Sequence, residues 1–332
     1  MSATTGVVAA PRRTEVLGAW ARRNLWTLGL VGFLAALLVF TKFIQPNYGV
    51  AGIQGLAISV VPLALAAAAQ AVVVLSGGID LSIGSIMALT SVVSATLMKG
   101  QSEEFGVVVV VGVLLLGLLV GAVNGILVVI TRVPDIVVTL AMSFVWAGVA
   151  LLVLGTPGGG AADWLKQLVA GSLGNEWIPK SAVILLVIVA AIWLPLRRAR
   201  LGLSLYAIGS DRLAAFRSGV SVGRTRVLAY MIMGLFAGLG GLSLTANTGI
   251  GTPVPGPYTL LSVAAVVLGG VSLAGGRGGL FGPIVAVVIL QLIRTDMTFL
   301  NVNTNLATVL QGVILIGVVM VGSLIQIRRA RA

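Results

Sequence analysis

The chain has 332 residues, of which 58% are hydrophobic and only 9% charged, and its mean hydropathy is +1.12. A soluble domain of this length is not so apolar, so the composition indicates a membrane protein. The net charge of +12 is scattered over separate gaps between apolar stretches, which argues against a nucleic-acid surface, and the lack of cysteine and histidine excludes disulfides, thiol nucleophiles and histidine metal ligands.

Ten apolar stretches follow one another along the chain, and most approach the ~20 residues needed to cross the hydrocarbon core. They predict an all-α, polytopic transmembrane helical bundle. The expected spans are 25–44, 51–74, 81–98, 106–131, 135–154, 181–196, 226–248, 258–274, 279–298 and 304–326. The stretches 181–196 and 258–274 are shorter than the others, so oblique or broken helices are open alternatives there.

Basic residues fall almost entirely in alternate gaps between these spans. With the N-terminus inside, 16 of the 21 lysines and arginines lie in cytoplasmic gaps. Basic residues near helix ends are retained in the cytoplasm, so we expect ten crossings with both termini inside. The remaining five, in outside gaps or at outer span ends, are Lys42, Lys99, Lys166, Lys180 and Arg294.

The chain is expected to form one membrane domain with short tails. Residues 1–24 are interpreted as a cytoplasmic tail rather than a signal peptide, 25–326 as the transmembrane domain and 327–332 as a second cytoplasmic tail. The longest external gap, 155–180, contains the run WLKQLVA, which predicts a short surface helix, with Trp164 and Trp177 as interfacial anchors.

Glycines at helical spacing predict close helix packing. Gly117, Gly121 and Gly125 lie four apart, and Gly234, Gly238 and Gly241 repeat nearly the same spacing. Small residues let membrane helices approach closely, so packing is the favoured interpretation for both sets.

The run SGGIDLSIGS at residues 76–85 breaks the chain between the second and third spans. Its two glycines end one helix, and Asp80 or Ser82 can cap the next. A carboxylate at the bilayer centre costs ~2.5–3.5 kcal/mol on insertion scales, so Asp80 is expected at the cytoplasmic mouth or in a wet cavity. A helix cap and a direct solute contact both remain open for it. A second break at 249–257 follows the corresponding helix of the second half, and paired breaks of this kind point to a transport pathway.

The longest internal gap, 197–225, contains the run YAIGSDRLAAFRSGV. Ser210 or Asp211 suits an N-cap and Gly219 suits a helix stop, so a short helix is predicted between them. Leu213, Phe216 and Val220 form one apolar stripe on it. Such a stripe docks into a partner's groove or lies on the bilayer surface, and both interpretations stay open.

Three stretches carry a resemblance to a known family. In order and spacing, SGGIDLSIGSIMALT, YAIGSDRLAAFRSGVSV and AAVVLGGVSLAGGRG resemble the membrane permeases of ATP-binding-cassette (ABC) importers for ribose, xylose and similar monosaccharides. The resemblance covers about residues 45–325. It departs at Arg212, where the family often has an acid, and at residues 258–261, where Tyr-Thr-Leu-Leu replaces Tyr-Glu-Leu-Asp.

The resemblance implies several partners. They are cytoplasmic ATP-binding subunits, an external solute-binding protein and a second permease in a homodimer or heterodimer, all at the bacterial cytoplasmic membrane with its lipid. In that family the segment matching 206–220 is the coupling helix that contacts the ATPase. Carried over to this chain, the ATPase-coupling residues are Ser210, Asp211, Arg212, Leu213, Ala214, Phe216 and Arg217.

The expected function is therefore that of a permease subunit that passes a monosaccharide or similar polyhydroxyl solute by alternating access. The chain has no G-x-x-x-x-G-K-[ST] phosphate loop, so ATP hydrolysis is expected on a separate subunit, and no cofactor, metal or nucleic acid is expected. The alternative is a self-sufficient ion-coupled transporter, although that class usually needs buried acids or histidines in its spans. A membrane-embedded enzyme is a third and poorer interpretation. Candidate pathway residues are the polar groups Gln70, Ser76, Asp80, Ser82, Asn124 and Ser143, of which at least half are expected to form only interhelical bonds.

Overall fold

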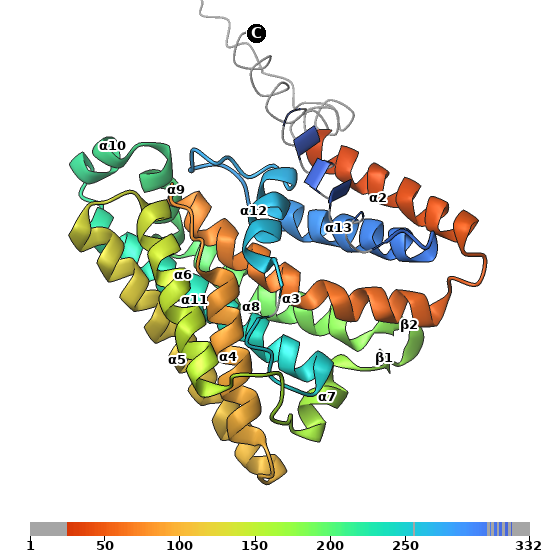
Figure 1. Ribbon diagram of the computed structural model, residues 1–332. Helices are drawn as coiled ribbons and strands as arrows, with labels where there is room; N and C mark the ends of the chain where they lie inside the picture. The colour runs from red at the N-terminus through yellow and green to blue at the C-terminus, as the bar shows by residue number, and fades with distance from the viewer. Residues whose placement is uncertain are drawn as a thin grey trace, which may run out of the picture.

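The computed structural model describes residues 25–254, 256–303 and single positions between 306 and 320. The expected tails, 1–24 and 327–332, lie outside the described residues, as does most of the tenth expected span, 304–326. Helices dominate the described chain (Figure 1). They are α2 Leu25–Ile44, α3 Val50–Leu75, α4 Ile83–Met98, α5 Glu103–Thr131, α6 Asp135–Val153, α7 Asp163–Val169, α8 Lys180–Arg198, α9 Arg200–Ser210, α10 Arg212–Arg217, α11 Val222–Thr248, α12 Tyr258–Leu268 and α13 Phe281–Phe299.

The predicted all-α polytopic bundle is confirmed. Seven described helices, α2, α3, α5, α6, α8, α11 and α13, are long and apolar enough to cross a membrane, and α4 and α12 are shorter apolar helices. The departures from all-α structure in the described chain are a small antiparallel hairpin in the external segment, β1 Ser172–Leu173 and β2 Asn175–Pro179, and an isolated antiparallel bridge between Gly158 and Gly251.

Of the two short apolar stretches, 258–274 is interrupted and 181–196 is a continuous helix. The stretch 181–196 becomes the full-length α8, whereas α12 has only 11 residues and ends before Gly269. At ~1.5 Å per residue, α12 is about 16 Å long, roughly half of the ~30 Å hydrocarbon core. Residues 269–280 then return to the start of α13 as a loop.

Local sequence accounts for several helix ends. The Ser102 hydroxyl accepts from the backbone N–H of Phe105 at 3.3 Å and caps α5, whose first turn carries Glu103 and Glu104. Acids there complement the helix dipole. The other end of α5 closes on Arg132 in the left-handed region at φ 59°, and α11 ends on Gly249 at φ 76°.

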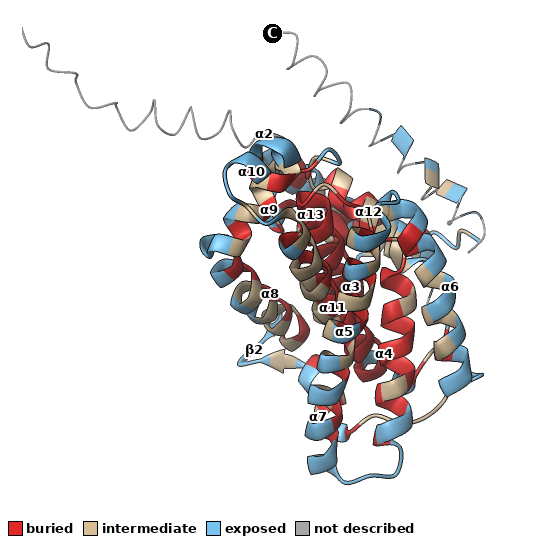
Figure 2. Ribbon diagram, turned by 90° about the vertical axis from the view of Figure 1, so that its left-hand side faces the viewer, coloured by how far each residue is buried: buried red, intermediate tan, exposed pale blue. Residues whose placement is uncertain are grey.

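Helix α3 forms the centre of the bundle. Every residue from 60 to 75 is buried, and Figure 2 shows the buried core around α3, α4 and α11. Helices α5 and α11 cross so closely that a Cβ on Gly121 would overlap the backbone carbonyl of Tyr230, and one on Gly117 would overlap that of Gly234. The packing predicted from glycine spacing is therefore found, with Gly241 facing α4 instead of α5.

The two long segments between spans, 155–180 and 197–225, lie at opposite ends of the bundle. Helices α9 and α10 occupy one end, and α7 occupies the other (Figures 1 and 2). The predicted surface helix is α7, and the Glu103 carboxylate accepts from the backbone N–H groups at its start, from Asp163 at 3.1 Å and Trp164 at 3.3 Å. This placement agrees with the alternate sides expected for the segments 155–180 and 197–225.

Candidate functional site

The three stretches that carry the family resemblance meet in space at the α9–α10 end. The carbonyl of Leu75, the last residue of α3, accepts from Gly276 N at 3.0 Å. Arg212 Nη2 donates to the carbonyl of Gly77 at 2.8 Å, and the Tyr206 hydroxyl donates to that of Gly278 at 2.8 Å. We call residues 75–78, 206–212 and 275–278 the motif junction.

Glycine allows the backbones of the motif junction to touch. A Cβ on Gly209 would lie 2.5 Å from Gly276 N and would overlap the carbonyl oxygen of Leu75. Gly275 and Gly276 adopt φ +89° and +68°, which side chains disfavour. Burial raises the pKa of Tyr206, against the opposing charge of Arg197, so the hydroxyl stays protonated and remains a donor.

Helix α10 presents Leu213 and Phe216 of the predicted apolar stripe to the outside, whereas Val220 lies beyond its end and is half-buried. Asp211, one of the two predicted caps, is the N-cap: its Oδ1 accepts from Leu213 N at 2.8 Å and Ala214 N at 3.0 Å. Gly219 ends the helical turn at φ +84°, as predicted. The Leu213 side chain is 58% exposed and the Phe216 side chain 66% exposed, whereas Ala215 is buried. Leu213 and Phe216 are therefore free of contacts that would bury them within the described chain.

The remaining coupling candidates surround this stripe. Ser210 is the last residue of α9 rather than a cap, and Arg217 is the last residue of α10. Ala214 and Arg217 are exposed, and Arg212 is exposed apart from its bond to Gly77.

Asp80 lies at the centre of a buried polar network behind the motif junction. Its Oδ1 accepts from the backbone N–H and the hydroxyl of Ser82, both at 2.6 Å. Asn124 Nδ2 of α5 donates to that hydroxyl at 2.8 Å, and Trp146 Nε1 of α6 donates to Asn124 Oδ1 at 3.0 Å. The Gln70 amide of α3 bonds the Asp80 backbone, donating to its carbonyl at 2.8 Å and accepting from its N–H at 3.3 Å. The network thus ties the break at 76–85 to α3, α5 and α6.

The structure therefore brings together four of the six pathway candidates: Gln70, Asp80, Ser82 and Asn124. The other two bond to their own helices, Ser76 Oγ to Val73 O at 2.7 Å and Ser143 Oγ to Leu140 O at 2.6 Å. Ser76 is buried beside the network, while Ser143 is half-buried on α6 and takes no part in it.

A largely buried ion pair adjoins the network. Asp135, at the start of α6, pairs with Arg226 of α11 and accepts from the Tyr230 hydroxyl at 2.9 Å. Thr139 Oγ1 donates to Asp135 O at 2.8 Å and accepts from Leu81 N at 3.0 Å. The pair therefore connects α6 and α11 to the break at 76–85.

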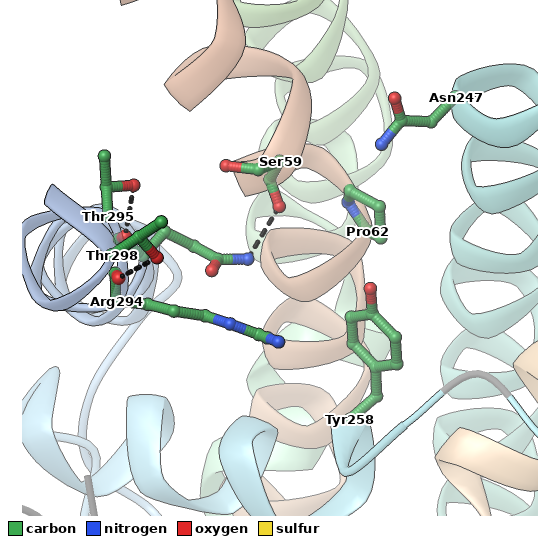
Figure 3. Close-up of a pocket in the computed structure, with 8 residues that line it drawn as sticks. Ser59, Pro62, Asn247, Tyr258, Arg294, Thr295 and Thr298 are labelled. Atoms are coloured by element: carbon green, nitrogen blue, oxygen red, sulfur yellow. Dashed lines mark hydrogen bonds between the residues drawn. The ribbon is translucent and has the colours of Figure 1, made fainter. Parts of the chain in front are cut away.

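A polar cavity of about 270 Å³ lies towards the α7 end, where α3, α11, α12 and α13 come together (Figure 3). Its lining comprises Ser59, Pro62, Asn247, Tyr258, Gln291, Arg294, Thr295 and Thr298. Pro62 has no N–H to donate within α3, and Gln291 Nε2 donates to the nearby carbonyl of Ser59 at 2.7 Å. We call this space the outer cavity.

Comparisons with known proteins establish the family. A family model described as "Branched-chain amino acid transport system / permease component" matches residues 52–319. The ribose import permease protein RbsC of Escherichia coli K12 is 32% identical over 262 residues, which cover 78% of this chain and 81% of the relative. The chain belongs to this permease family.

Other curated relatives of the permease agree on its class. The D-allose transport system permease protein AlsC of Escherichia coli K12 is 32% identical over 255 residues, covering 76% of this chain and 77% of the relative. The L-arabinose ABC transporter permease protein AraH of Azospirillum brasilense is 32% identical over 316 residues, covering 92% and 89%. No solved structure matches the chain. The resemblance inferred from the three stretches is confirmed, and the chain is a multi-pass permease component of an ABC importer in the bacterial inner membrane.

Two features of this permease were missed by sequence reasoning. The Asp135–Arg226 pair was hidden because both residues sit at span ends, where charges ordinarily set topology. The outer cavity was hidden because Asn247, Tyr258 and Arg294 also lie at or near span ends, where polar groups are expected to face the membrane surface. Only the meeting of four helices makes these groups converge.

Proposed function

We propose that this permease forms the membrane pathway for a monosaccharide or similar polyhydroxyl solute and moves it by alternating access. ATP hydrolysis is assigned to a separate cytoplasmic subunit that docks on α10. The curated relatives support the solute class, since their names specify ribose, allose and L-arabinose. An external solute-binding protein and a second permease complete the proposed importer.

The observation that carries this proposal is the exposed stripe on α10. Leu213 and Phe216 of this six-residue helix are 58% and 66% exposed. Asp211 caps the helix, and Arg212 fixes it to the carbonyl of Gly77. A short rigid helix with an exposed aromatic residue suits a partner groove, where such side chains act as anchors.

The same contacts suggest how docking is transmitted. Displacement of α10 pulls on Gly77 through Arg212, and displacement of α9 pushes on the Leu75 carbonyl through Gly209. Both contacts end at the break that joins α3 to α4. We assign the network of Gln70, Asp80, Ser82 and Asn124 to holding α4 in register with α3, α5 and α6 beside the pathway.

The test is Phe216→Ala in cells that express the whole importer. Truncation of a buried aromatic anchor costs ~2 kcal/mol or more, which weakens the partner's binding about thirtyfold. We expect loss of ATPase copurification and of solute uptake at a normal level of permease. Leu203→Ala is the matched control, because Leu203 of α9 is 65% exposed and lies outside α10.

Two results would count against the docking surface. Normal copurification and uptake with Phe216→Ala would assign the stripe to lipid. An equal loss with Leu203→Ala would show that any exposed apolar residue of this segment has the same effect.

A further inference from the structure

We propose that the outer cavity binds a sugar acid, a monosaccharide-sized polyhydroxyl solute with one carboxylate, and that Arg294 binds the carboxylate. This inference rests on the proposed function and specifies its solute class. It derives from the polar groups of the outer cavity and from the distribution of charge in the chain.

Three polar side chains meet in the outer cavity without partners. Among the described residues, the Asn247 amide, the Tyr258 hydroxyl and the Arg294 guanidinium make no hydrogen bond or ion pair. They come from α11, α12 and α13, and Figure 3 shows Arg294 extending from α13 towards the space beside Pro62 and Tyr258. Asn247 and Arg294 are exposed and Tyr258 is half-buried, so all three are open to a ligand or to water, whereas lipid would offer them no hydrogen bonds.

The neighbouring groups add neutral hydrogen-bonding capacity. Thr295 Oγ1 donates to Gln291 O at 2.9 Å and Thr298 Oγ1 donates to Arg294 O at 3.1 Å, so both hydroxyls keep lone pairs that can accept from a ligand. Gln291 uses one amide proton on Ser59 O and keeps its other groups. Hydroxyls, amides and one aromatic ring suit the alternating polar and apolar faces of a sugar.

The charge of Arg294 is not neutralised by an acid of the described chain. Of the nine acidic residues, Glu15 alone lies outside the described residues, and it belongs to the expected cytoplasmic tail. The ion pairs found within the described part are Lys166–Asp163 and Arg226–Asp135. Asp296 is buried two residues further along α13, and side chains two apart on a helix face different directions.

A neutral sugar would offer this guanidinium hydrogen bonds but no counter-charge. A carboxylate forms two parallel hydrogen bonds with a guanidinium, which is the geometry that arginine favours. One arginine balances one carboxylate, and about 270 Å³ suits a solute the size of a monosaccharide. The site therefore fits a monoanionic sugar better than a neutral sugar or a sugar phosphate with two charges.

The test compares D-galacturonate with D-galactose, which differ only in the carboxylate that replaces the C6 hydroxymethyl group. The full-length permease is placed in nanodiscs of zwitterionic lipid, and each sugar is titrated by saturation-transfer difference NMR, which detects weak binding. We expect galacturonate to bind at least about tenfold more tightly, equivalent to about 1.4 kcal/mol. Acetate, which has the charge but no hydroxyls, is expected to bind more weakly than galacturonate.

Variants of the permease test whether Arg294 causes the preference for galacturonate over galactose. Arg294→Gln keeps hydrogen bonding but removes the charge, so both sugars should bind equally, whereas Arg294→Lys should retain part of the preference. Lys99→Gln is the matched control, because Lys99 follows the end of α4 and does not line the outer cavity. It should leave the tenfold preference intact.

Several results would overturn the inference. They are equal binding of both sugars by the unaltered permease, no binding of either, or a preference that survives Arg294→Gln. Equal binding would also be the outcome if Arg294 served a lipid phosphate. If galacturonate is not preferred while Phe216→Ala still abolishes ATPase capture, the importer function stands and only the sugar-acid assignment is lost.

Discussion

Removing one charge of the Asp135–Arg226 pair should destabilise the permease strongly. Both side chains are only 11% exposed, and no other acid of the described chain pairs with Arg226. In Asp135→Asn the shape is kept and the Tyr230 hydroxyl retains an acceptor, but the guanidinium is left buried without a counter-charge. Breaking a buried pair in this way costs ~3–5 kcal/mol, and the retained hydrogen bond favours the lower end, about 3 kcal/mol.

The size of the effect is measurable. Unfolding entropy of ~2.1 cal/mol/K per residue gives ~0.7 kcal/mol/K for 332 residues, so about 3 kcal/mol corresponds to a fall in the melting temperature of roughly 4 °C. Thermal unfolding in detergent, followed by tryptophan fluorescence, reports it. Asp163→Asn is the matched control, since Asp163 pairs with Lys166 at the surface, where their side chains are 69% and 43% exposed and the pair contributes little.

The double variant Asp135→Asn with Arg226→Gln separates charge from contact. It leaves neither charge uncompensated, so it should recover most of the stability lost in the single variant. The reasoning fails if Asp135→Asn melts together with Asp163→Asn, or if the double variant is no more stable than the single one.

Two further predictions concern coupling and topology. Gly209→Ala should leave ATPase copurification normal but lower solute uptake, because the new methyl group meets the backbone of the motif junction. Gly223→Ala is the control and should leave uptake unchanged, since its methyl group meets only the side chain of Val129. Normal uptake with Gly209→Ala would refute the proposed transmission from α9 to the end of α3. The chain has no native cysteine, so cysteines placed at Ser172 and Ser210 can be labelled selectively. The first should react in intact cells and the second only after permeabilisation, and the reverse pattern would contradict the ten-span topology with both termini inside.

The membrane helices could be located from sequence because the lipid core demands long apolar runs. Where a run ends inside the protein was less accessible. The stretch 258–274 was expected as a span with a broken helix left open, and α12 stops at Leu268, whose carbonyl accepts from Trp26 Nε1 of α2 at 2.8 Å. Gly270 then adopts φ +80°. The indole N–H that satisfies this helix end comes from a distant helix, so the local sequence does not predict the contact.

In the candidate site, too, some residues could be predicted from the sequence and others depend on the tertiary structure. Asp80, Ser82 and Asn124 could be singled out because polar groups inside apolar spans are costly, and the structure joins them through hydrogen bonds. Their partner Trp146 was not found, since a tryptophan in a span looks like ordinary apolar lining. Arg294 was noted only as an outer span-end cation, because its convergence with Asn247 depends on the tertiary arrangement.

Helix α3 takes part in all three regions. Leu75 at its end belongs to the motif junction, Gln70 bonds the Asp80 backbone, and Ser59 and Pro62 line the outer cavity. From Ser59 to Leu75 the helix rises about 24 Å at ~1.5 Å per residue, and it is buried from residue 60 onward.

A helix packed on all sides moves as a unit or not at all, because close-packed interiors transmit displacement rather than absorb it. We therefore infer that a shift at the motif junction reaches the outer cavity through α3. Gly209→Ala tests this inference, because it disturbs one end of α3 and is scored by transport that depends on the other.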